Sequence, residues 1–125
     1  MYNVGHETAK GHETAIRVLL AAKADVHVRN KEGMTPLHVA AVQNQEAAIR
    51  ALVAVKANVN AKGVEGVTPL HLAAHVGLWG MIMALVAAKA DVHATTAENK
   101  TPLRAAVEAG KTSAVQVLRE YGATR

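Results

Sequence analysis

Thr35-Pro36-Leu37-His38 recurs as Thr68-Pro69-Leu70-His71 and again as Thr101-Pro102-Leu103-Arg104. Successive copies are 33 residues apart both times, with no insertion between them. Other positions keep the same register, since Ile49 and Ile82 are also 33 residues apart. A fixed period of this length indicates a chain built from repeated structural units rather than around one irregular core.

Each repeat is predicted to form two short helices followed by an extended loop. Thr35 can cap a helix with its hydroxyl, and Pro36 suits the first helical position, where no amide donor is needed. The polar, glycine-containing stretch 25–33 and its counterparts predict a projecting, hairpin-like loop. The apolar positions expected to form the buried stripes of the two helices are Leu37, Ala40, Ala41, Ala48, Ile49, Leu52 and Val53.

The composition favours thin helices that stack tightly. Half of the 125 residues are apolar, but there is no Phe, one Trp and two Tyr. Small side chains allow helices to approach toward the short end of the roughly 8–10 Å interaxial range. Isolated helices under about 12–15 residues are marginal in water. Stacking solves this problem because each helix pair then completes the core of its neighbour.

The 33-residue period with the pattern T-P-L-H-x-A-A resembles the ankyrin repeat, and the resemblance covers nearly the whole chain after about residue 11. It implies an all-α ankyrin-repeat solenoid of about four stacked helix-turn-helix units with projecting hairpin loops. We expect a single domain over residues 1–125, with units at approximately 1–28, 29–61, 62–94 and 95–125.

The first and last units depart from the family pattern. Tyr2-Asn3-Val4-Gly5 occupies the motif position of the first unit, which is therefore expected to be degenerate, although a second helix is still expected around residues 13–22. Arg104 replaces the motif His in the last unit, which we interpret as a C-terminal cap.

Three lysines, Lys23, Lys56 and Lys89, stand where the family usually has the Gly that ends the second helix, and only Gly122 keeps it. We expect these lysines to adopt the left-handed conformation and to form a row along one edge of the solenoid. The row is interpreted as solvated charge, with a docking strip for an acidic partner as the alternative.

The composition also excludes several classes of protein. There is no Cys, no apolar run of signal-peptide length at the N-terminus and no stretch of about 20 apolar residues, so we expect an intracellular, cytoplasmic protein with no membrane partner. The net charge is +4 and the pI is about 9.6, but the basic residues are dispersed among acidic ones. We therefore expect no nucleic-acid partner.

Catalysis and metal binding are not expected either. His6-Glu7-Thr8-Ala9-Lys10 begins like a zinc-protease helix but has Lys10 where the second His is required. His71 and His75 have a spacing that can bridge a metal, yet two ligands fall short of the four of a structural zinc site. The resemblance implies that His71, like His38, supports a loop by hydrogen bonding with the motif Thr. We therefore predict no enzyme activity, no cofactor and no metal.

The resemblance implies a protein–protein interaction module that binds its partner through a concave face of loop tips and first helices. The candidate partner-binding residues at those positions are Lys31, Glu32, Met34, Val42, Gln43, Val64, Glu65, Val67, His75, Val76, Ala97, Glu98, Lys100 and Glu108. Trp79, at the start of a second helix, is a further candidate, either as an exposed anchor or as a residue packed against the neighbouring unit.

We expect a monomer that binds another protein, whose identity the sequence leaves open. Two alternatives remain. In the first, the chain is an engineered or reduced ankyrin scaffold with no natural partner. In the second, it is a regulatory ankyrin segment of a larger protein. The regular spacing and the lack of Cys fit a scaffold, whereas the free variation between units argues against it. Fold-level analogy carries most of the functional inference.

Overall fold

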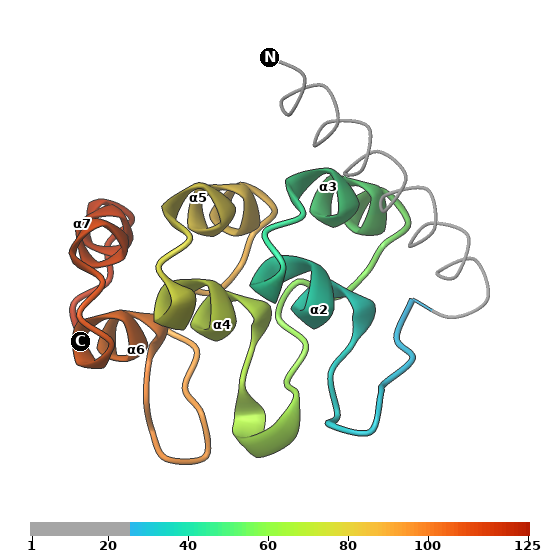
Figure 1. The fold of residues 1–125 in the computed structure, drawn as a ribbon, viewed down its shortest axis with the longest axis horizontal. Helices are drawn as coiled ribbons and strands as arrows, with labels where there is room; N and C mark the ends of the chain where they lie inside the picture. Colours follow the sequence, from blue (N-terminus) through green and yellow to red (C-terminus); the bar gives the residue numbers. More distant parts are fainter. Residues whose placement is uncertain (1–25) are drawn as a thin grey trace.

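The computed structural model describes residues 26–125, and within them the chain forms three pairs of antiparallel helices and no strand (Figure 1). The second helix predicted around residues 13–22, and Lys23, lie outside the described residues. The helices are α2 (Pro36–Val42), α3 (Glu46–Ala54), α4 (Pro69–Val76), α5 (Trp79–Ala87), α6 (Pro102–Glu108) and α7 (Thr112–Glu120), with a short 3-10 turn, η1 (Val64–Gly66), before α4.

The pairs stack side by side in two layers. In Figure 1 the first helices α2, α4 and α6 form one layer, the second helices α3, α5 and α7 form the other, and the loops before α4 and α6 project from the side of the first layer. Contacts run between neighbouring helices of the same layer and between the two helices of each pair. This is the predicted all-α solenoid, in which each pair completes the core of the next.

The start of each first helix follows from the repeated Thr-Pro. The hydroxyl oxygens of Thr35, Thr68 and Thr101 accept the backbone N–H three residues later at 3.4, 3.3 and 3.2 Å. The proline that follows each threonine occupies the first turn, where it forgoes no hydrogen bond.

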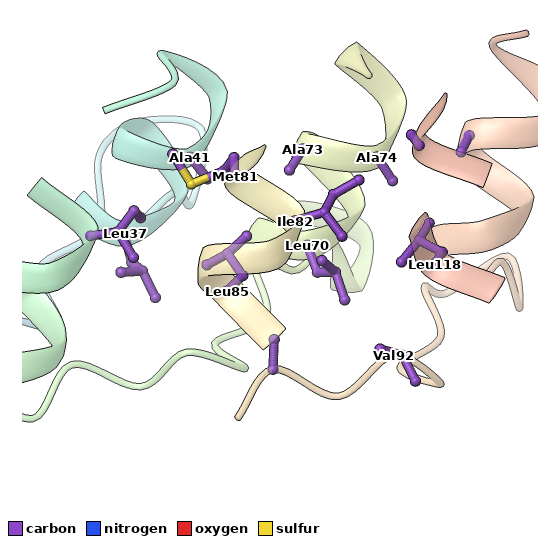
Figure 2. Close-up of a cluster of buried hydrophobic side chains, with 14 of the residues drawn as sticks. Leu37, Ala41, Leu70, Ala73, Ala74, Met81, Ile82, Leu85, Val92 and Leu118 are labelled. Carbon is purple, nitrogen blue, oxygen red and sulfur yellow. The ribbon is translucent and has the colours of Figure 1, made fainter. Parts of the chain in front are cut away.

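The core consists of the predicted stripes, joined across the stack. Leu70 in α4 and Leu85 in α5 are both fully enclosed, and they belong to one buried cluster with Ala41 of α2 and Met81 of α5 (Figure 2). Alanines at the contacts between first helices let the helices approach closely. Val53 differs slightly from the prediction, because it packs at the margin of the core and stays partly exposed.

The second helices end as the lysine positions predict. Lys56 and Lys89 have φ values of 70° and 77°, in the left-handed region, and Gly122 has a φ of 93° at the corresponding place. Both lysine side chains are exposed. The backbone therefore adopts the helix-ending conformation even where the residue does not favour it.

Replacing Lys89 with glycine is expected to raise the free energy of unfolding by about 0.5–1 kcal/mol, because glycine adopts a positive φ without a Cβ penalty. The reciprocal variant, Gly122→Ala, is expected to lower it by about 1 kcal/mol. An added Cβ at Gly122 would meet no heavy atom within 4 Å, so only backbone strain is tested there. Urea denaturation measures the change in the free energy of unfolding for both variants. A lower free energy of unfolding for Lys89→Gly would contradict the view that the positive φ strains the lysine.

Candidate partner-binding face

The loops between the helix pairs are closed and tied to one another by backbone hydrogen bonds. The N–H of Gly63 donates to the carbonyl of Val67 at 2.7 Å, and Thr96 and Lys100 close the next loop in the same way at 2.9 Å. Between loops, the N–H of Ala97 donates to the carbonyl of Glu65 at 2.8 Å. The loops before α4 and α6 are therefore neighbours, and their tips stack in the same order as the helices.

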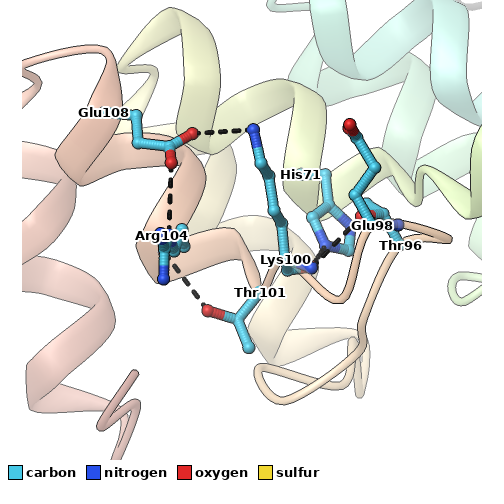
Figure 3. A network of polar contacts seen from close by, with 7 residues as sticks. All are labelled: His71, Thr96, Glu98, Lys100, Thr101, Arg104 and Glu108. Carbon is cyan, nitrogen blue, oxygen red and sulfur yellow. Dashed lines mark hydrogen bonds and ion pairs between the residues drawn. The ribbon is translucent and has the colours of Figure 1, made fainter.

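His71 holds the base of one loop against the helix layer. Its Nδ1 accepts from the backbone N–H of Thr68 at 3.2 Å and lies 2.8 Å from the Thr68 hydroxyl oxygen. A backbone N–H can only donate, so Nδ1 carries no proton and the proton is on Nε2. That Nε2–H then donates to the carbonyl of Lys100, also at 2.8 Å (Figure 3).

His38 repeats this arrangement one unit earlier. Its Nδ1 is bound by Thr35 and its Nε2 lies 2.8 Å from the carbonyl of Val67. Burial lowers the pKa of both His38 and His71 below the ordinary value of 6.5, against the opposing effect of the bonds to Val67 and Lys100. Both rings are therefore neutral structural supports, with their nitrogens already used inside the protein.

A hollow of about 280 Å³ lies between the loops and the helices α4 and α6. Its lining brings together six of the candidate residues: Glu65, Val67, His75, Glu98, Lys100 and Glu108. Leu72, Ala105 and Ala109 contribute apolar surface to the same hollow. Side chains from two units, far apart in sequence, thus line one depression.

A second hollow, of about 370 Å³, lies one unit earlier along the stack and is lined by Asn30, Glu32, Met34, His38, Val39, Val42 and Leu72. It contains three more of the candidates, Glu32, Met34 and Val42. Leu72 lines both hollows, so the two adjoin. We call the surface formed by the linings of the two hollows the binding face.

A family model described as "Ankyrin repeats (3 copies)" matches residues 6–96 and 55–124. The chain belongs to the ankyrin-repeat family. A search of the curated proteins found no match. Ankyrin repeats are generally protein–protein interaction modules, and the family is typically non-enzymatic. Within residues 26–125, no helix has the length and apolar character needed to cross a bilayer.

The structure separates other candidates from the binding face of this ankyrin domain. Lys31 and Val64 lie with Arg29 and Gly63 around a depression at the loop tips. The remaining four line neither hollow: Gln43, Val76, Ala97 and Trp79. Trp79 is 55% exposed on α5, in the other layer of helices, beside Met83 and the α3 residues Glu46 and Arg50. It therefore belongs to a different surface of the solenoid.

Leu72 and Val39 are among the residues of the binding face that the sequence reasoning did not name as candidates. Both occupy the variable position x of T-P-L-H-x-A-A, immediately after the supporting histidine. Each is partly exposed, whereas the alanines that follow are buried. The available signal was that position x varies between the copies, whereas the next position is alanine in all three, at Ala40, Ala73 and Ala106.

The charges of the first hollow, between the loops and the helices α4 and α6, are partly paired. Glu108 accepts from Lys100 at 2.9 Å and from Arg104 at 3.1 Å, and Figure 3 shows both cations reaching the same carboxylate. The hydrogen bond to Glu108 raises the pKa of Lys100, and the bonds from Lys100 and Arg104 lower the pKa of Glu108. In residues 26–125, neither Glu65 nor Glu98 has an ion-pair partner.

Proposed function

We propose that this chain is a non-catalytic protein-binding module that holds its partner on the binding face. The observation that supports this proposal most directly is the pair of adjoining hollows joined at Leu72. Their walls combine apolar side chains with charged residues at the loop rim, which is the composition of a protein-binding patch. The cytoplasmic location and the monomeric state expected from the sequence stay predictions.

The stability of the face is part of the proposal. The hollows are lined by short helices and by loops whose bases are held by His38 and His71. A surface held in place before binding loses little conformational freedom when a partner docks. The energy of the contacts is then available for affinity rather than for ordering the loops.

Capture from a source-cell lysate tests the proposal. The double variant Met34→Glu, Val67→Glu places one carboxylate in each hollow and is expected to lose the partner that wild type retains, since apolar contacts at a protein interface tolerate buried charge poorly. Val107→Glu is the matched control. Val107 is 53% exposed on α6 and lines neither hollow.

The three proteins must give the same circular dichroism spectrum, so that binding is compared between folded chains. A partner retained by Val107→Glu and lost by the double variant supports the proposed face. A partner that binds the double variant as well as wild type would contradict it and direct attention to Trp79. If wild type captures nothing specific, the scaffold alternative is favoured instead.

A further inference from the structure

A groove of about 590 Å³ lies between α3 and α5, which are neighbours in the second layer of helices (Figure 1). One side carries Trp79 and Met83 of α5, which are 55% and 43% exposed. The other side carries Glu46 and Arg50 of α3. The rest of the lining consists of the small residues Gly80, Ala84 and Ala87. We call this surface the back groove, and none of its residues lines either hollow of the binding face.

The α5 helix is apolar on all sides, since each of its nine residues is apolar. A helix of this kind is normally enclosed on every side. Met81, Ile82 and Leu85 are buried in the core, but Trp79 and Met83 are exposed. The helix therefore has an apolar side that residues 26–125 leave uncovered.

Stacking of the repeats does not explain this apolar side. The positions of Trp79 and Met83 have counterparts 33 residues away in the neighbouring second helices. The residues at the two positions are Glu46 and Arg50 in α3, Trp79 and Met83 in α5, and Thr112 and Gln116 in α7. The fold thus accepts charged or polar side chains there, and the large apolar pair of α5 serves no internal packing.

The two sides of the back groove are in register. Glu46 is the first residue of α3 and Trp79 is the first residue of α5, so these two stand at the same height, and Arg50 and Met83 stand together one turn later. Within residues 26–125, neither Glu46 nor Arg50 takes part in an ion pair. The groove therefore offers an acid followed by a base along one helix, beside an apolar pair along the next.

We infer that the back groove is an interface between two copies of this chain, related by a two-fold axis that crosses α3 and α5. In this arrangement each helix lies antiparallel to its own counterpart, so that Glu46 of each copy meets Arg50 of the other. Trp79 of each copy likewise meets Met83 of the other, and a thioether beside an aromatic ring is a favourable contact. Every contact occurs twice, as in a closed dimer.

The dimer leaves the binding faces open, because those faces lie on the first layer of helices and on the loops. The inference is therefore independent of the proposed function, and it replaces the monomer expected from the sequence. A dimer carries two binding faces, so a partner with two matching sites would be held more tightly than by one face alone.

Charge reversal tests the inference by sedimentation velocity, on the full chain from micromolar to millimolar concentration. Wild type is expected to pass from monomer to dimer as the concentration rises. Glu46→Arg and Arg50→Glu each place like charges opposite one another and are expected to weaken the dimer more than about ten-fold. The double variant Glu46→Arg, Arg50→Glu restores opposite charges and is expected to dimerise as wild type does.

An equimolar mixture of the two single variants gives a sharper result. The bases of one chain then face the acids of the other, so a mixed dimer is expected although neither variant dimerises alone. Lys31→Glu is the matched control, because it makes the same charge change as Arg50→Glu at a loop tip outside the back groove. It is expected to leave the dimer unchanged, and all variants must give the circular dichroism spectrum of wild type.

Trp79 reports on the groove directly, since it is the one tryptophan of the chain. Its fluorescence emission is expected to move to shorter wavelength as wild type dimerises, and to stay constant with concentration in Arg50→Glu. Trp79→Ala is expected to weaken the dimer about thirty-fold, the loss typical of a central interface anchor.

Three results would overturn the inference. They are a wild type that stays monomeric throughout the series, a dimer that both single charge reversals leave intact, and a double variant or mixture that fails to restore a dimer that the single variants lose. None of them affects the proposed function, which the lysate capture tests separately. A partner lost by Met34→Glu, Val67→Glu and retained by Arg50→Glu would sustain the binding face whatever the state of association.

Discussion

Leu70→Ala is expected to lower the free energy of unfolding by about 2–5 kcal/mol, the cost of truncating a leucine in a close-packed core. Leu70 is 1% exposed in α4, the middle first helix, which contacts α2, α5 and α6. The cavity would therefore open at the centre of the stack, where several helices would have to move to close it. Urea denaturation followed by circular dichroism at the helix band measures the loss.

Val76→Ala on the same helix is the matched control. Val76 is 40% exposed, and its truncation is expected to change the free energy of unfolding by less than about 0.5 kcal/mol. The comparison separates burial from any general effect of shortening a side chain in α4. A loss below about 1 kcal/mol for Leu70→Ala would mean that the buried stripe is not where the structure places it.

His71→Ala is expected to destabilise the fold by about 2–4 kcal/mol, although it removes no apolar surface of comparable size. The reason is that His71 connects two units. Without the ring, the buried backbone N–H of Thr68 loses its acceptor, and the carbonyl of Lys100 loses a donor in a partly buried setting. Thermal and urea denaturation of the variant measure the effect.

Arg104→Ala is the control at the corresponding motif position of the last unit. Arg104 is exposed, and within residues 26–125 its side chain is joined only to Glu108 of its own unit, while its backbone N–H, which alanine keeps, donates to Thr101. Its removal is expected to cost less than about 0.5 kcal/mol. Similar losses for the two variants would contradict the view that His71 acts by tying neighbouring repeats together.

The destabilisation by His71→Ala is expected to depend on pH. The pKa of His71 is lowered in the folded state, so the unfolded chain takes up a proton first as the pH falls through 6.5. The stability that His71 and His38 contribute is thus complete above the unfolded pKa and is lost as the pH falls toward the folded one. Between about pH 7.5 and 5.5, wild type and Arg104→Ala are expected to lose stability more steeply than His71→Ala.

Much of the fold could be predicted from the sequence because its determinants are local. Thr35 and Pro36 start a helix by satisfying or removing donors within one turn, and Leu37 with the alanines that follow defines the buried side. The left-handed end at Lys56 and Lys89 was also predictable, since a fixed repeat imposes the same backbone on whichever residue occupies the position. The 33-residue period then required stacking, because no pair of such short helices can bury its apolar side alone.

The binding face was only partly predictable, because it depends on contacts between units. Nine of the fifteen candidates line the two hollows, and among them Glu32, Glu65 and Glu98 were anticipated from the resemblance to ankyrin repeats. The contribution of Leu72 was not, since a side chain shared by two hollows is defined by the distance between neighbouring repeats. The pairing of Lys100 with Glu108 likewise depends on how the loop meets α6.

The sequence by itself determined the repeat, the helix starts and ends, and the buried stripes, since each of these depends on residues within one turn or one period. The tertiary structure decided which exposed residues share a surface. It placed Trp79 on the second layer of helices, away from the other candidates, because the side on which a residue lies depends on how the two helices of a pair pack. It also brought Lys100 and Arg104 to the same carboxylate, that of Glu108, because ion pairing depends on how the loop before α6 meets that helix.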